Sequence, residues 1–226
     1  MTIHLQKEIE KLKTMILSMS ARVEKGFHDI SEAVVHIDAE TARRVIKEEQ
    51  YINDIELEIE EECLKCLALY QPVAIDLRLI VAILKINNEL ERINDVSVNA
   101  AERVLDLAAL RPLETPFDIK GMSVKVAQML SMSLDALINM DPQKAIEVCN
   151  LDDEVDDLNR LIFQQVTAEI KRNPEQVGHL LLYASISRYF ERIADLASNI
   201  AEDVVYLVEG DIVRHQDLED YDLKGK

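Results

Sequence analysis

The segment ELERINDVSVNAAERV at residues 89–104 has a close counterpart in RYFERIADLASNIAEDV at residues 188–204. Apolar residues in both segments are spaced three and four apart, which is typical of an amphipathic helix with one buried face. The residues of the first segment that recur 100 positions later are Glu91, Arg92, Ile93, Asp95, Asn99, Ala101 and Glu102. Such self-similarity indicates an internal duplication. The sequence therefore predicts two equivalent helices, one in each half of the chain.

Long periodic segments surround these two helices, and few residues interrupt them. Proline, glycine and capping residues divide the chain into expected helices at 5–36, 38–70, 72–110, 118–140, 142–172 and 173–208. Asp141 followed by Pro142 is typical of a helix start, and Gly210 of a helix stop. The predicted fold class is all-α, a tandem duplication of two antiparallel three-helix bundles. The repeats are expected at 1–110 and 117–210, with an acidic C-terminal tail at 211–226.

The repeated polar residues form one stripe along each of the two matching helices. At roughly 100° per residue, Glu102 lies about 20°, Asp95 about 40° and Asn99 about 80° from Glu91. The apolar residues lie on the opposite side, so the carboxylates point away from the nearest core. The second helix repeats this stripe with Glu191, Asp195, Asn199 and Glu202.

A looser repeat, at an offset of 103, relates the expected helices 38–70 and 142–172. The corresponding positions are Glu49, Ile52, Asn53 and Ile55 in the first and Asp152, Val155, Asp156 and Leu158 in the second. Glu56 and Glu60 lie on about the same face as Glu49. If each of these helices lies beside its carboxylate-striped neighbour, each half presents four clustered residues. The two expected clusters are Glu49, Asn53, Glu91 and Asp95, and Asp152, Asp156, Glu191 and Asp195.

The spacing of these carboxylates is unfavourable for an ordinary surface helix. Like charges at i,i+4 cost a few tenths of a kcal/mol, whereas a Glu to Lys pair there gains a similar amount. Clustered carboxylates are stable around a cation, and all-oxygen ligand sets suit hard ions. We therefore predict binding of one or several iron, manganese or magnesium ions, with Asn99, Glu102, Asn199 and Glu202 in the ligand stripes. His179 has the wrong helical phase to join Glu191, which argues against zinc and ferritin-like sites. The alternative is a structural scaffold or oligomerisation module whose acidic faces are simply solvated.

Composition excludes several other classes of protein. The 226 residues include 43 Asp or Glu against 25 Lys or Arg, a net charge of -18 that repels nucleic acid. The charged N-terminal sequence MTIHLQKEIEKLK lacks a signal-peptide pattern, so a cytoplasmic location is expected.

No Gly-rich phosphate loop, GxSxG or HExxH motif occurs, so the chain is not expected to be an enzyme. Acid–base chemistry by paired carboxylates is a less favoured alternative. Cys63, Cys66 and Cys149 are interpreted as helix thiols in preference to a redox or zinc site.

Three segments, ALYQPVAIDLR (68–78), LERINDVSVNAAE (90–102) and FERIADLASNIAEDVVYLVEG (190–210), closely resemble the PhoU family of phosphate-transport accessory proteins. The resemblance extends over nearly the whole chain. It implies two three-helix bundles with surface metal clusters held by pairs of (E/D)xxxD motifs. The implied pairs are Glu49/Asn53 with Glu91/Asp95, and Asp152/Asp156 with Glu191/Asp195. Asn53 replaces a carboxylate, which predicts a weaker N-terminal site, and Asn94 and Ala194 replace a frequent glycine, which should stiffen the helices.

The same resemblance implies a regulatory role. The chain would be a negative regulator of the phosphate-starvation response, acting as a homodimer at the inner membrane face. Its partners would be the ATPase subunit of the phosphate-specific ABC transporter and the phosphate sensor histidine kinase. The segment 71–78 is a candidate partner surface, although turn and cap chemistry explains it equally well.

Overall fold

The structure is a computed structural model that describes residues 3–111 and 117–210, and these residues form helices and connecting turns without a β-strand. The helices are α1 (Ile3–His36), α2 (Ala39–Tyr70), α3 (Ala74–Ala108), α4 (Ile119–Asn139), α5 (Pro142–Arg172) and α6 (Val177–Glu209), with a 3-10 turn, η1 (Pro174–Gln176), before α6. The prediction of an all-α chain with six long helices is confirmed.

Short polar residues set most of the helix boundaries. The carboxylate of Asp38 accepts hydrogen bonds from backbone N–H groups at the start of α2, and Asp141 does the same for α5. Pro142 occupies the first turn of α5, and α6 ends at Gly210 with φ 80°. These boundaries agree with the sequence prediction.

Two predicted boundaries were wrong by a few residues. Helix α3 begins at Ala74 and not at Pro72, because Gln71 is left-handed (φ 46°) and Val73 is extended, so the chain first crosses from α2 to its neighbour. In the second half, Pro174 opens the 3-10 turn, and α6 begins only at Val177.

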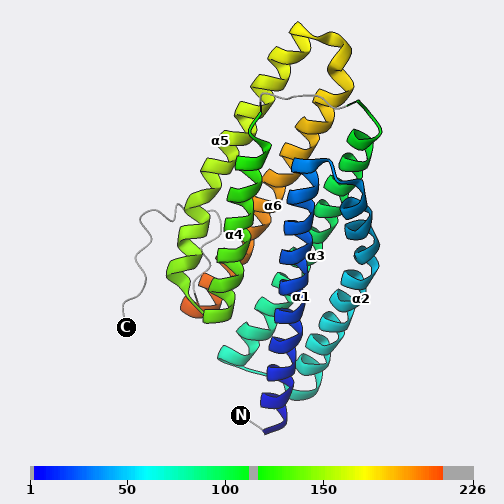
Figure 1. Cartoon of the computed structure of the whole chain (residues 1–226). Coiled ribbons are helices and arrows are strands. Elements are labelled where there is room, and N and C mark those ends of the chain that lie inside the picture. Colours follow the sequence, from blue (N-terminus) through cyan, green and yellow to red (C-terminus); the bar gives the residue numbers. More distant parts are fainter. Residues whose placement is uncertain (1–2, 112–116, 211–226) are drawn as a thin grey trace.

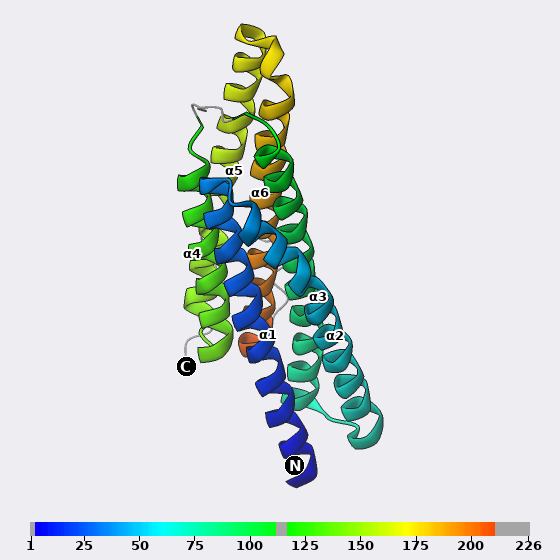
Figure 2. The same ribbon diagram turned by 45° about the vertical axis from the view of Figure 1, so that its right-hand side comes forward.

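The helices of each half pack side by side, and the two halves pack on each other (Figure 1). In the first half α1, α2 and α3 are mutual neighbours, and in the second half α4, α5 and α6 are. Figure 2 shows α3 and α6 running in opposite directions through the middle of the molecule. Helices α1 and α4 also contact each other, which closes the second side of the junction.

Hydrogen bonds join equivalent positions of the two repeats. In the first half Asn87 Nδ2 of α3 donates to the backbone carbonyl of Glu56 of α2, at 2.9 Å. In the second half Ser187 Oγ of α6 donates to Asn159 Oδ1 of α5, at 2.7 Å. These pairs are related by the same offsets, 100 and 103, that relate the sequence repeats. Each half therefore joins its two repeated helices in the same antiparallel register.

The two halves share one hydrophobic core. Buried side chains from all six helices form a single cluster. At its centre Phe27 of α1 meets Phe190 of α6 edge to face, with ring centroids 5.6 Å apart. Lys85 of α3 also reaches across to the buried carboxylate of Asp203 on α6, at 3.0 Å. Packing of one repeat therefore depends on the other.

The predicted division into residues 1–110, 117–210 and 211–226 remains a prediction. Residues 112–116 of the linker and 211–226 of the tail lie outside the described residues. Among the described helices, none combines the length and apolarity that a membrane crossing needs.

Candidate functional site

The register of α2 and α3 brings the N-terminal candidates together. The bond from Asn87 to Glu56 places these two residues at the same level of the antiparallel pair. One and two helical turns further along α3 lie Glu91 and Asp95, and one and two turns back along α2 lie Asn53 and Glu49. All four are half-buried in the seam between the helices. Helices α2 and α3 therefore lie side by side in the register that the spacing predicted, and the role of the four residues as ligands remains a prediction.

The N-terminal seam holds oxygen atoms that are shielded from water and lack a partner. Burial raises the pKa of Glu91 to about 7, and the adjacent carboxylates of Asp95 and Glu56 add to this rise. Two oxygen atoms of this seam, Asn53 Oδ1 and Asp95 Oδ1, are buried without a hydrogen-bond partner. Buried acceptors without donors are uncommon, because their lost hydration is not compensated. An added cation would supply this compensation.

The C-terminal seam has the same architecture with a complete set of carboxylates. Burial raises the pKa of Asp152 to about 7, and the charges of Asp195 and Asp156 raise it further. Burial, then Asp195 and Asp156, raise the pKa of Glu191. Partial burial of the Asp195 carboxyl group and the charge of Asp156 raise the pKa of Asp195, although this residue is the most exposed of the four. All four predicted carboxylates therefore interact across the α5–α6 seam.

These residues do not form a ready-made metal site in the arrangement seen. In the described part of the chain, no three Asp, Glu, His or Cys side chains converge as metal ligands would. Separation is expected of like charges without a cation between them. Binding an ion would require the side chains to rotate toward a common point, while the helix backbones already lie in register.

The remaining predicted ligands lie in different surroundings. Asn99 is exposed and donates to the carbonyl of Asp95 in its own helix, and Glu102 pairs with the adjacent Arg103 at 3.3 Å. Asn199 Nδ2 lies 3.5 Å from Glu89 of α3, at the contact between the two halves. Glu202 is close enough to Cys149 for its charge to raise the pKa of that thiol. The structure thus supports the two four-residue clusters more directly than these four outer positions.

Glu56 is a site residue that the predicted ligand set did not include. Its carboxylate contributes to the raised pKa of Glu91, and burial raises its own pKa. Its helical phase matched Glu49, so the signal was present in the sequence. The hydrogen bond that Asn87 donates to the backbone carbonyl of Glu56, which fixes the level of this residue, could not be predicted from spacing.

The three thiols have the properties of interior cysteines. All are free; Cys63 and Cys66 are buried in α2, and Cys149 is half-buried in α5. Burial raises the pKa of Cys63 and of Cys149 to about 12. Such thiols are protonated and unreactive at neutral pH, as the sequence interpretation expected.

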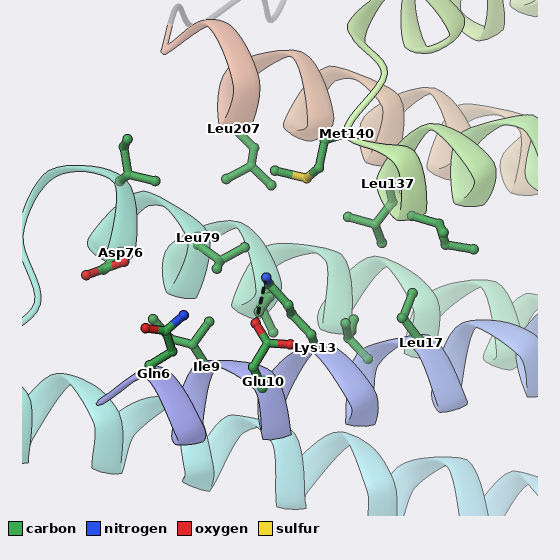
Figure 3. A pocket seen from close by; sticks show the side chains of 14 residues that line it. Gln6, Ile9, Glu10, Lys13, Leu17, Asp76, Leu79, Leu137, Met140 and Leu207 are labelled. Atoms are coloured by element: carbon green, nitrogen blue, oxygen red, sulfur yellow. Dashed lines mark hydrogen bonds and ion pairs between the residues drawn. The ribbon is translucent and has the colours of Figure 1, made fainter. Parts of the chain in front are cut away.

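A separate apolar groove of about 330 Å³ opens where α1, α3 and α6 meet the α4–α5 turn. Figure 3 shows Leu207, Met140 and Leu137 on one side of this groove and Leu79 and Ile9 on the other. The groove adjoins the segment 71–78, of which Val73 and Ile75 are exposed by 74% and 67%. The contact of segment 71–78 with a partner protein remains a prediction.

The raised pKa values predict how the metal-free protein responds to pH. Folded Glu91 and Asp152 titrate near 7, whereas unfolded carboxyls titrate near 4, so the folded state binds more protons between about pH 4 and 7. These two groups therefore lower stability as pH rises through that window. In chelator, we expect Glu91→Gln with Asp152→Asn to increase Tm at pH 8 more than at pH 5, measured by thermal unfolding. An equal change in Tm at both pH values would contradict the raised pKa values. The control is Asp153→Asn, which removes a carboxylate from the exposed face of α5.

The fold and the seams define a class of protein: a duplicated helical bundle that carries paired acidic seams on a shared core. Comparison with known proteins gives the family. The model of the PhoU domain matches residues 16–104 and again residues 119–204. This chain therefore belongs to the PhoU family.

Similar proteins cover nearly the whole chain. The PhoU homolog of Aquifex aeolicus, called a phosphate-specific transport system accessory protein, is 36% identical over 95% of this chain and 97% of its own length. The accessory protein PhoU of Serratia marcescens is 34% identical over 92% of this chain and 86% of its own. The crystal structure of PhoU from Pseudomonas aeruginosa superposes with a TM-score of 0.87 at 33% identity, covering 91% of this chain and 99% of that one.

A second solved structure, the phosphate transport system regulatory protein PhoU from Streptococcus pneumoniae, superposes with a TM-score of 0.82 at 26% identity, covering 92% of this chain and 99% of that one. These named relatives are accessory and regulatory proteins. The prediction that the chain is not an enzyme is confirmed by its place in this family.

Proposed function

We propose that this chain is a metal-binding regulatory adaptor of phosphate uptake and a negative regulator of the phosphate-starvation response. The names of its relatives support the phosphate-transport role. The observation that carries the metal proposal is the pair of duplicated carboxylate seams, in each of which carboxyl pKa values are raised, and in the N-terminal seam two buried oxygens also lack donors.

The residues present fit a hard cation. In the N-terminal site the ligands are Glu49, Asn53, Glu91 and Asp95, and in the C-terminal site Asp152, Asp156, Glu191 and Asp195. Every donor atom is a carboxylate or amide oxygen, which suits magnesium, manganese or iron and offers no soft ligand. A bound ion would neutralise the repulsion within each seam. Because Asn53 is neutral, the N-terminal site has one charge fewer and is expected to bind more weakly.

The partners belong to the same proposal. By its resemblance to the PhoU family, the chain acts on the cytoplasmic side of the membrane as a homodimer. There it links the ATPase subunit of the phosphate-specific ABC transporter to the phosphate sensor histidine kinase. The exposed apolar residues Val73 and Ile75, beside the groove of Figure 3, support a protein contact at this end of the molecule.

Deletion of the gene tests the regulatory role. We expect phosphate-starvation transcripts to rise in phosphate-replete cells, because a negative regulator has been removed. The measurement is a reporter of phosphate-responsive transcription in high and low phosphate, with the intact gene restored as the control. Unchanged expression in high phosphate would contradict the adaptor role, whatever the metal content of the protein.

A further inference from the structure

A pocket unrelated to the acidic seams lies in the first repeat, between α1 and α2, with α3 as its floor. Its volume is about 180 Å³. Arg22 and Lys25 of α1 and Arg44 of α2 line it, and Asn94 of α3 forms part of its floor. Three cations around one small pocket are unexpected in a chain with a net charge of -18.

Asn94, which lines this pocket, has an unused hydrogen-bond donor. Its side chain is only 5% exposed, and its Nδ2 atom is buried without a hydrogen-bond partner. A buried donor without an acceptor is costly, so a water molecule, an ion or a ligand is expected to accept its hydrogen bond. The equivalent residue of the second repeat is Ala194, which has no donor. The unused donor is therefore a feature of the first repeat only.

Gly26 leaves space in the pocket that packing does not explain. It lies in the middle of α1, where glycine is less favourable than alanine. A Cβ atom added there would meet no atom within 4 Å, so no neighbouring group requires its absence. Because Gly26 lines the pocket, a side chain at this position would extend into the pocket space.

The charges in the pocket favour an anion. Asp29 accepts a hydrogen bond from Lys25 at 2.9 Å and lies 3.6 Å from Arg44, and Glu48 is the other carboxylate of the lining. Three cations against two carboxylates leave one positive charge. Guanidinium groups match the geometry of tetrahedral oxyanions, because they donate parallel hydrogen bonds to two oxygens.

We propose that this pocket binds a small phosphate-type oxyanion, either inorganic phosphate or a phosphate monoester. Arg22 and Arg44 would contact the charged oxygens, Asn94 Nδ2 would donate from the floor, and the bare backbone at Gly26 would leave room for the anion. The site lies on the α1 side of α2 and α3, whereas the carboxylates Glu49 and Asp95 line the α2–α3 seam, so it is distinct from the proposed metal site.

Binding of inorganic phosphate to the full chain tests the proposal. The protein is held in chelator, which prevents phosphate from binding through a metal, and titrated calorimetrically at constant ionic strength. We expect one saturable site, weakened about tenfold or more by Asn94→Ala and by Arg44→Gln. Gly26→Ala should unfold at an equal or higher temperature and yet lose binding by a similar factor, because alanine favours the helix but takes up pocket space that the anion would occupy.

Gly178→Ala is the matched control, because Gly178 also lies in a helix with no atom within 4 Å of an added Cβ, but outside the pocket. Glycerol phosphate is titrated in parallel. If glycerol phosphate binds as well as inorganic phosphate, the site accepts a phosphate monoester. If only inorganic phosphate binds, the ligand is the free anion. The proposal is overturned if neither probe saturates the protein, or if Gly26→Ala and Asn94→Ala bind phosphate as the unaltered chain does.

Discussion

Alanine at both Glu191 and Asp195 is expected to lower the metal content of the C-terminal site to background. The change removes two of the four oxygen ligands, and loss of ligands should weaken binding beyond the roughly 10- to 100-fold cost of losing an outer-shell partner. The metal-free variant should be at least as stable as the unaltered chain, because the two removed groups repel Asp156 and Asp152. Elemental analysis of protein purified without chelator measures the first expectation, and thermal unfolding in chelator the second.

The matched control is Asp153→Ala with Asp157→Ala. These two carboxylates have the same i,i+4 spacing and lie next to the seam residues in sequence, but they are on the exposed face of α5. The control removes the same charge, so it separates loss of ligands from loss of acidity. Full metal retention by the Glu191/Asp195 variant would disprove the site assignment.

Phe27→Ala is expected to give the largest loss of stability. The ring of Phe27 is 1% exposed and packs edge to face on Phe190, across the contact between the two repeats. Truncating a buried phenylalanine costs about 3–5 kcal/mol, through lost burial and the cavity left behind. For a chain of this size that corresponds to a fall of about 6–20 °C in Tm. Urea unfolding in chelator measures the change in free energy.

Phe163→Ala provides the comparison, because Phe163 lies on α5 and is 38% exposed. Its truncation should cost clearly less than that of Phe27. The form of the transition is also informative: because the repeats share one core, both should unfold together in a single step. A loss at Phe27 no larger than that at Phe163 would show that the contact between repeats adds little stability.

Most of the fold could be predicted from the sequence, because the helices are long and their boundaries carry strong local signals. Apolar spacing and capping residues such as Asp141 and Gly210 act within a few positions along the chain. The start of α3 was misplaced because it depends on the left-handed backbone of Gln71, for which the residue type is a poor guide. The antiparallel contact of α3 with α6, where Lys85 meets Asp203, is long-range and has no local signal.

The positions of the candidate ligands on neighbouring helices could be predicted from the sequence, whereas their role as metal ligands remains a prediction. Spacing identified the two four-residue clusters, since duplication and helical phase are properties of sequence. How far each carboxylate is shielded from water depends on the neighbouring helix, so the raised pKa values of Glu91 and Asp152 needed the structure. The same is true of the pocket at Gly26 and Asn94, where three helices supply one cavity.

A metal titration of the metal-free protein tests the central claim most directly. The chain is stripped with chelator, exchanged into buffer and titrated with magnesium, manganese and anaerobic iron(II) while its Tm is recorded. An ion that binds only the folded state at a hundredfold excess over its Kd adds about 2.7 kcal/mol, which raises Tm by about 5–10 °C for a chain of this size. We expect such a rise with at least one of the three ions. An unchanged Tm with all three would contradict it and leave a structural scaffold with solvated acidic faces.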